Sequence, residues 1–326
     1  MSFTRYNTED SVVSAETVVR GLWSGDNYTL STFFTSSNYT EYYVDVFDSN
    51  FNTSTSASIQ FSLQFGQVNG SGSAPINSAV VGYSPSRVVY GQYRNLVYGT
   101  ETTNFSFDGG STTSNAIYVI NVSRARYKES LLPGSLNMVL AGPSGSFTYT
   151  DDSGTTNLTR FVGENRYFNI ISGSNGSYFT SGTPAKYYGL FFPDLDIIVL
   201  DANALTGSLT PGIAYSNSTS TVYNNLNIWR ALASGSNFQM KSSETVSARY
   251  FFTRIKNSEY NYTTNPSVID ANGNLLYTTL INNPQTYITT VGMYNDNSEL
   301  LAVAKLSKPL VKDFTKEALI RVKLDY

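Results

Sequence analysis

The sequence predicts a mainly β fold, built from antiparallel sandwich or barrel-like sheets with a few short helices. Three observations lead to this prediction. Short runs rich in β-branched and aromatic residues alternate with polar residues, as in half-buried strands. Clusters of Asn, Ser, Gly and Pro separate these runs and are typical of turns. Two stretches, 84–99 and 221–233, instead repeat their apolar residues at the period of a helix.

Strands are expected along most of the chain. The segment 12–19 is either an ordinary first strand or a short docking segment. In the segment 58–66, apolar and polar residues alternate strictly, which predicts a half-buried antiparallel strand. Its four inward residues are Ile59, Phe61, Leu63 and Phe65. Further strands are expected at 28–35, 42–48, 116–123, 137–142 and 246–255.

Two helices interrupt the predicted strands. Ser84 is a suitable N-cap and Pro85 suits the first position of the first helix. Its apolar face is expected to comprise Val88, Val89, Gln92 and Leu96, with Tyr90, Tyr93 and Tyr98 packed on the sheet. The second helix is expected to align Asn224, Ile228 and Leu232 on one face. A short helix or turn is expected near 124–135, where Pro and Gly end the segment.

The domain organisation predicted from the sequence has three parts. Residues 1–137 form a β-rich domain with one helix, and residues 138–215 form an inserted β-meander or sandwich of short strands. Within this insert, the apolar run 197–200 predicts a fully buried strand. Residues 216–326 supply a helix and a C-terminal β block that completes the first domain.

The C-terminal block contains the clearest hairpin signal. Residues 288–294 form one predicted strand, 295–298 the turn, and 299–306 the returning strand. Asn and Asp in this turn are turn-forming residues before they are metal ligands. Gly292 is expected to mark a bulge or a close approach of another group.

Composition excludes several classes of function. Charged residues make up 14% of the chain and the net charge is −3, so no basic field attracts nucleic acid. The absence of Cys and His removes thiol nucleophiles, Ser-His-Asp triads and most transition-metal sites. No signal peptide and no apolar run of membrane-spanning length is found. We therefore expect no enzymatic activity, no cofactor, no nucleic-acid partner and no membrane insertion.

Acidic residues leave two alternatives open. Asp194, Asp196 and Asp201 have the oxygen ligands that calcium prefers, although the EF-hand spacing is absent. Asp151 and Asp152 precede Ser-Gly and are more typical of a turn. We expect no metal at either place. Glycoside hydrolysis needs two close carboxylates in a cleft, which a sequence alone does not reveal.

Several segments carry a resemblance to a known group of proteins. Residues 288–309, together with 118–129, 190–195 and 314–326, resemble virion structural proteins of contractile-tailed, T-even-related marine cyanophages. The hairpin also resembles baseplate-proximal regions of phage tail-collar fibres. The group has no defined site motif, so the resemblance implies a place in a particle and assigns no catalytic or binding residue.

This resemblance implies a phage virion structural protein, with tail or baseplate as the expected place and assembly through protein–protein contacts as the expected role. The expected partners are other virion proteins and further copies of the chain, in a particle assembled in the host cytoplasm. The alternatives are a receptor- or glycan-binding fibre, or a neck or capsid-associated protein. The first candidate docking surface lies within residues 287–326 and comprises Tyr287, Ile288, Val291, Tyr294, Leu300, Leu301, Val303 and Leu306.

Overall fold

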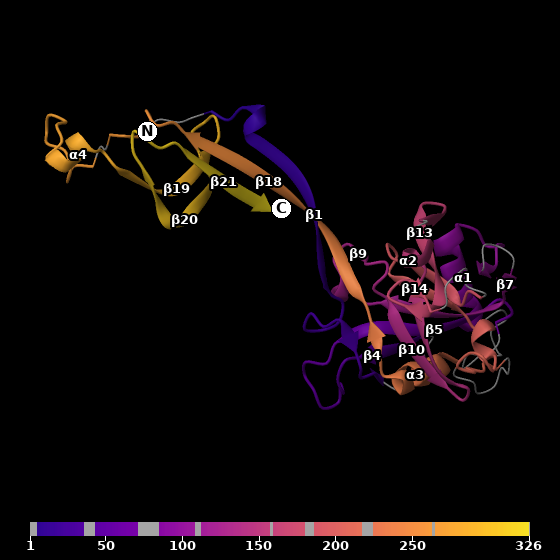
Figure 1. Cartoon of the computed structure of the whole chain (residues 1–326). Helices are drawn as coiled ribbons and strands as arrows, with labels where there is room; N and C mark the ends of the chain where they lie inside the picture. The colour runs from indigo at the N-terminus through magenta and orange to yellow at the C-terminus, as the bar shows by residue number, and fades with distance from the viewer. Residues whose placement is uncertain are drawn as a thin grey trace. The chain divides into compact units, whose positions relative to one another are not determined.

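The structure is a computed structural model, and it describes residues 5–35, 43–70, 85–107, 112–156, 159–179, 186–216, 224–262 and 265–325. The fold is mainly β, with 47% strand and 16% helix, as the sequence predicts. The chain divides into two compact units (Figure 1). Unit 1 comprises residues 1–16 and 245–326, and unit 2 comprises residues 17–244. The chain passes from one unit to the other within strands β1 (Ser11–Gly21) and β18 (Lys241–Ile255).

Unit 2 is built around one curled, half-barrel antiparallel sheet. Its central strands follow one another in the order β10, β11, β13, β15, β16, so the expected meander is present as part of this larger sheet. The expected domain boundaries near 137 and 215 both fall inside unit 2. In spatial order the strands are β2 (Thr29–Leu30), β17 (Phe238–Gln239), β10 (Asn137–Gly142), β11 (Gly145–Asp151), β13 (Asn165–Ser174), β15 (Gly189–Phe192), β16 (Ile197–Asp201), β8 (Ala116–Val122), β5 (Ile59–Gln67), β4 (Tyr43–Phe47) and β3 (Phe34–Thr35).

Both faces of the central strands are buried. In β8, Tyr118 and Ile120 join one apolar cluster, while Ile117 and Val119 join a second cluster on the opposite face. Helix α3 (Asn224–Gly235) contributes to the first cluster and helix α1 (Pro85–Tyr98) to the second. All five residues of β16 are buried, which confirms the strand predicted from its continuous apolar run.

Strand β5 departs from its predicted pattern. Phe61, Leu63 and Phe65 lie in the core as expected, but Ile59 at the strand end is 37% exposed. Gln60, expected to face solvent, is fully buried because its amide bonds to Ser24 and to the carbonyl of Ser58. The second face of β5 is therefore partly buried, with Ser62 and Gln64 half-buried, and helix α1 contacts this strand.

Helix α1 begins at Pro85 and ends at Tyr98, close to the predicted bounds, but its predicted face was partly wrong. Val88 and Leu96 are exposed, whereas Tyr90 and Tyr93 lie inward as expected. Tyr90 is accommodated because its hydroxyl donates to the Ser114 carbonyl at 2.7 Å and accepts from the Phe105 amide at 2.9 Å. The expected N-cap Ser84 lies outside the described residues.

Smaller elements complete unit 2. Strand β9 (Ser130–Leu131) pairs with β18 at Ser242 and Ser243. The expected short helix or turn near 124–135 is a 3₁₀ turn at Arg124–Arg126. The other small elements of unit 2 are β6 (Phe105–Phe107), β7 (Thr112–Ser114), α2 (Ser153–Thr156), β12 (Arg160–Val162), β14 (Ser177–Tyr178) and a 3₁₀ turn at Ala204–Thr206. Unit 1 has a 3₁₀ turn at Thr8–Asp10.

Unit 1 contains two small sheets and a short helix (Figure 1). The strand order β1, β18, β21 (Ala318–Asp325) forms one sheet, in which Ala248–Ile255 pair with Ala318–Asp325. The predicted hairpin forms the other sheet, with β19 (Thr286–Tyr294) and β20 (Leu300–Lys312). Helix α4 (Thr278–Asn282) precedes the hairpin. No helix in the described part of the chain has both the length and the apolar content needed to span a bilayer.

Candidate functional site

The candidate docking surface lies on the hairpin β19–β20. Its turn is closed by Asn295, whose side chain bonds to both the amide and the carboxylate of Glu299, at 2.8 and 2.6 Å. Ser298 has a positive φ of 65°, a conformation common in tight turns. The pairing shifts register between Met293 and Tyr294 because β20 carries an extra residue there.

The eight candidate residues on the hairpin differ in how exposed their side chains are. Along β20 exposed and half-buried residues alternate, so Leu301 and Val303 lie on the open face and are 67% and 57% exposed. Leu306 and Ile288 are half-buried, and Val291 is buried. The remaining candidates are also exposed: Tyr287 at 61%, Tyr294 at 40% and Leu300 at 53%. Five of the eight residues are therefore accessible to a partner.

Gly292 lies close to the ring of Tyr294. A Cβ at this position would lie 2.9 Å from the Tyr294 ring, so the ring occupies the space that a side chain would need. This is the close approach that the sequence predicted for Gly292.

Exposed apolar side chains are concentrated throughout unit 1. Among the described residues, 17 of the 28 exposed large apolar side chains belong to unit 1, although it is the smaller unit. The same residues of unit 1 include four buried apolar side chains: Ala248, Ile255, Val291 and Ala318. Both apolar clusters of the described chain belong to unit 2. Unit 1 thus presents to solvent the kind of side chain that unit 2 buries.

Sequence reasoning missed much of this exposed surface. Leu276, Tyr277 and Ile281, in and before helix α4, are each more than half exposed. Leu319 on β21 is 61% exposed, and Phe314 just before that strand is 54% exposed. The sequence does show that residues 275–325 are rich in apolar side chains. Which of these side chains are exposed cannot be assigned before the core is known.

One face of the β18–β21 pair carries charged and aromatic side chains. Tyr250 donates a hydrogen bond to Glu16 at 2.6 Å, and Lys323 pairs with the same carboxylate at 2.8 Å. The Arg321 guanidinium lies 5.3 Å from the centre of the Tyr250 ring. The hydrogen bond from Lys323 lowers the pKa of Glu16. These contacts are internal to unit 1 and compensate the charges of this face.

The aspartates considered for calcium are not gathered into one site. Asp194 pairs with Arg166 at 2.8 Å, while Asp196 receives a hydrogen bond from Tyr127. Asp201 lies at the far end of β16 and accepts from the Asn203 amide at 3.0 Å. No group of three acidic residues suited to a metal ion is found among the described residues.

Asp151 and Asp152 are fully buried and serve the local fold. Both oxygens of Asp151 accept from the Gly134 amide at 2.9 Å, and burial raises the pKa of this carboxyl group. Asp152 pairs with Arg160 at 2.8 Å and accepts from the Asn169 amide at 2.9 Å. Their oxygens are thus engaged by protein donors.

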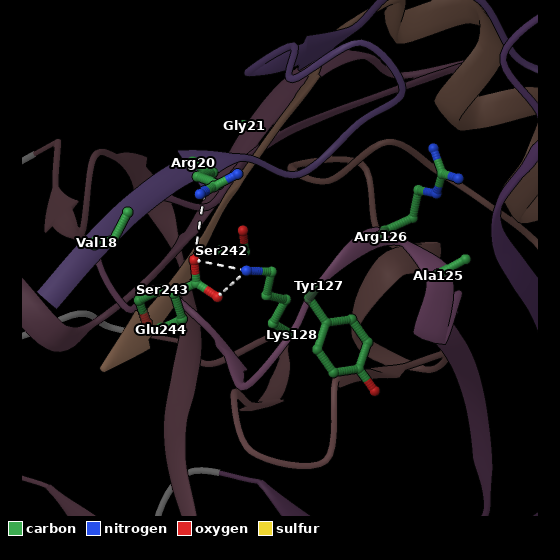
Figure 2. Close-up of a pocket in the computed structure, with 10 residues that line it drawn as sticks. All are labelled: Val18, Arg20, Gly21, Ala125, Arg126, Tyr127, Lys128, Ser242, Ser243 and Glu244. Carbon is green, nitrogen blue, oxygen red and sulfur yellow. Dashed lines mark hydrogen bonds and ion pairs between the residues drawn. The ribbon is translucent and has the colours of Figure 1, made fainter. Parts of the chain in front are cut away.

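A shallow cavity of about 210 Å³ lies in unit 2 (Figure 2). Glu244 stands at its centre and pairs with Lys128 at 2.8 Å and Arg20 at 3.4 Å. Figure 2 shows the Arg126 guanidinium pointing away from this group, and it donates to the Ser24 hydroxyl at 2.6 Å. Glu244 offsets one of the two positive charges that converge on it, and both cationic side chains are more than half exposed, so these ion pairs are weak.

A second cavity of about 360 Å³ is lined by Trp23, Asp48 and several hydroxyl groups. Such a set is reminiscent of sugar recognition, but the Trp23 ring is 2% exposed and packs on Phe61 and Phe238. Asp48 accepts from the Ser58 amide and hydroxyl at 3.0 and 3.2 Å. This cavity therefore presents no open aromatic platform from Trp23.

Comparisons with protein-family models, with curated proteins and with solved structures find nothing that matches this chain. Function must therefore be argued from the surface of the molecule itself.

Proposed function

We propose that this chain is a structural protein of a phage particle, a component of the tail or baseplate, that acts in assembly through protein–protein contacts made by unit 1. The particle setting is supported by the sequence resemblance of residues 288–309. The contact role is supported by the surface of unit 1, where 17 large apolar side chains are exposed and four apolar residues are buried.

Covering exposed apolar side chains removes them from water, which is favourable. Burying a Leu or Val side chain completely is worth about 1.5–3 kcal/mol. Leu300, Leu301 and Val303 are each more than half exposed, so covering them would gain roughly 1 kcal/mol per side chain. Monomeric proteins seldom expose large contiguous apolar patches, and such patches mark interaction sites. The occupant in this proposal is a neighbouring protein of the particle.

The direct test is cryo-electron microscopy of the particle whose genome encodes this chain, with the chain traced in the density. The expected result places it in the tail end, with the hairpin β19–β20 buried against neighbouring subunits and more than about 1,000 Å² covered per specific contact. Absence of the chain from purified particles, or a hairpin facing solvent in the assembled particle, would overturn the proposal. A distal position with exposed aromatic side chains would favour receptor binding instead.

A further inference from the structure

Unit 1 contains a buried amine that no carboxylate neutralises. Lys312, the last residue of strand β20, has no exposed surface. Its Nζ atom donates to the side-chain oxygen of Asn261 at 2.7 Å and to the backbone carbonyl of Asn257 at 3.1 Å. None of the ion pairs formed by the described residues includes Lys312. Both burial and the missing counter-charge therefore disfavour the positive charge of this amine.

The side chain of Asn261 is held in one orientation by the same group of contacts. Its Nδ2 atom donates to the Asn257 carbonyl at 2.7 Å, while its Oδ1 atom accepts from Lys312. The Asn257 carbonyl oxygen thus bonds to the amine nitrogen and to the amide nitrogen. The amide carbon Cγ lies about 1.2 Å from Oδ1, so Nζ is at most about 3.9 Å from Cγ. Reacting atoms in a near-attack arrangement are about 3–3.5 Å apart, which is close to this limit.

We infer that Lys312 and Asn261 form an isopeptide bond, a covalent amide that joins the two side chains. The inference goes beyond the proposed function and does not depend on it. The lysine amine is the nucleophile. The Nζ–Cγ bond forms, the Cγ–Nδ2 bond breaks, and the amide nitrogen leaves as an ammonium ion. Two of the three protons of the Lys312 ammonium group pass to the leaving nitrogen, so atoms and charge balance without an oxidant or another reactant.

The reaction removes the buried charge from the protein. The product is a neutral secondary amide, whose N–H can still donate to the Asn257 carbonyl. The positive charge leaves with the ammonium ion and is solvated by water. Because a buried charge without a counter-ion is costly and a hydrogen-bonded amide is not, burial favours the product.

A hydroxyl group on the same side of the hairpin is available for the proton transfer. Thr286 lies opposite Lys312 in the register of β19 and β20, so their side chains point to the same side of this sheet. The Oγ1 atom of Thr286 is buried and has no hydrogen-bond partner. Because a hydroxyl group both donates and accepts, it can pass a proton from the attacking nitrogen to the leaving one. The adjacent carboxylate of Asp313 is engaged by Thr315 and Lys316 instead.

The bond gives unit 1 a link that its core does not supply. Asn261 follows strand β18 and Lys312 ends strand β20, so the bond joins the two small sheets of unit 1. The strands of these two sheets do not pair with each other in the described part of the chain. Unit 1 buries few apolar side chains, and the chain has no Cys for a disulfide. A crosslink between residues so distant in sequence stabilises a fold mainly by restricting the unfolded chain.

The test is the intact mass of the folded, full-length chain, measured by mass spectrometry after several days at mildly alkaline pH. The main species is expected to be lighter than the mass calculated from the sequence by one molecule of ammonia. Trypsin locates the bond, because it does not cut after a modified Lys312. Residues 257–305 and 306–316 are therefore expected as one joined species, since Pro309 also prevents cutting after Lys308.

Three controls separate this bond from other losses of ammonia. Lys312→Met and Asn261→Ala are each expected to keep the full mass, because each variant lacks one of the reacting groups. Asn257→Ala is the matched control: it keeps the backbone carbonyl that holds both nitrogen atoms, so it is expected to lose ammonia like the wild type. Wild type kept unfolded in guanidinium chloride is expected to form no joined species, because the fold brings the two side chains together.

A folded wild type that keeps its full mass would overturn the inference, as would tryptic peptides that are cut after Lys312. Loss of ammonia that persists in Lys312→Met, or that maps to another asparagine, would also contradict it. Each of these results leaves the assembly role to the cryo-EM map. Absence of the chain from particles, in contrast, overturns the assembly role without affecting the mass of the isolated chain.

Discussion

Asp196 makes the stability of unit 2 depend on pH. It lies in the turn between β15 and β16, with 3% of its surface exposed and its Oδ1 atom without a hydrogen-bond partner. Burial raises the pKa of this carboxyl group from 3.8 to about 6, although the hydrogen bond from Tyr127 and the charge of Arg124 oppose the shift. The same neighbourhood raises the pKa of Tyr127 to about 12, mainly through burial.

The direction of the effect follows from the proton balance. The folded state binds the proton of Asp196 more tightly than the unfolded state, so this group favours folding most at low pH. Its contribution declines as pH rises from about 4 to about 6, where the folded protein must ionise a buried carboxyl group. A shift of about two pKa units corresponds to roughly 3 kcal/mol of unfolding free energy lost across this range.

Asp196→Asn removes the ionisation and leaves the shape unchanged. Asn tolerates the positive φ of 58° found at this position. Its amide oxygen can accept from Tyr127, but its NH₂ group then replaces the unpartnered Oδ1 and stays buried without an acceptor, at a cost of about 1–3 kcal/mol. We expect the variant to be less stable than the wild type at pH 4, and this deficit to shrink or reverse by roughly 3 kcal/mol at pH 7.

The assay is urea unfolding followed by tryptophan fluorescence at pH values from 4 to 7. Both tryptophans of the chain, Trp23 and Trp229, belong to unit 2, so the signal reports this unit. Asp194→Asn is the control for the loss of one charge from the same turn, where the Asp194 side chain is 48% exposed. If the unfolding free energies of wild type and Asp196→Asn change in parallel with pH, the reasoning is refuted.

Two further predictions concern packing and a buried amine. Gly142→Ala is expected to lower the melting temperature of unit 2, with a cost of about 1–3 kcal/mol, because its Cβ would lie 2.1 Å from the Pro211 carbonyl oxygen. Gly91→Ala has open space in helix α1 and is expected to stabilise by about 0.5–1 kcal/mol in the same calorimetric scan. Lys312→Met is expected to destabilise unit 1 by about 1–3 kcal/mol, because the buried ammonium group donates to the carbonyl of Asn257 and to the side chain of Asn261. Hydrogen exchange measures this as faster exchange of the amides of residues 257–261. Unchanged exchange of these amides would contradict the prediction. Lys308→Met, at an exposed position, is the control.

The elements that could be predicted are those whose sequence pattern has a single structural solution. The uninterrupted apolar run of β16 fits a strand buried on both faces. Asn224, Ile228 and Leu232 recur at helical spacing and are all buried in α3. The hairpin turn was also predictable, because the Asn295 side chain closes it through bonds to Glu299, which is local in sequence.

Predictions were less accurate where burial depended on distant partners. Val88 was predicted to lie on the inner face of α1, yet it is 58% exposed. Gln60 is buried because Ser24, far away in sequence, satisfies its amide. Neither outcome follows from periodicity, since each depends on what the rest of the tertiary structure places beside the residue.

The candidate docking surface was only partly predictable for a related reason. The sequence identified the hairpin as an apolar segment, but it did not distinguish exposed Leu301 from buried Val291. It also gave no indication that residues 1–16 and 245–326 form a unit separate from 17–244. Two segments so distant in sequence are brought together by strand pairing, which local patterns do not encode.

The two units differ in how much apolar surface they bury and in their net charge. Unit 2 buries two apolar clusters on opposite faces of its sheet, which stabilise its fold, and it carries the whole net charge of −3. Unit 1 is neutral, exposes most of its large apolar side chains and has few buried ones. This division of charge and apolar area is the physical basis of the proposal that unit 1 makes the protein–protein contacts.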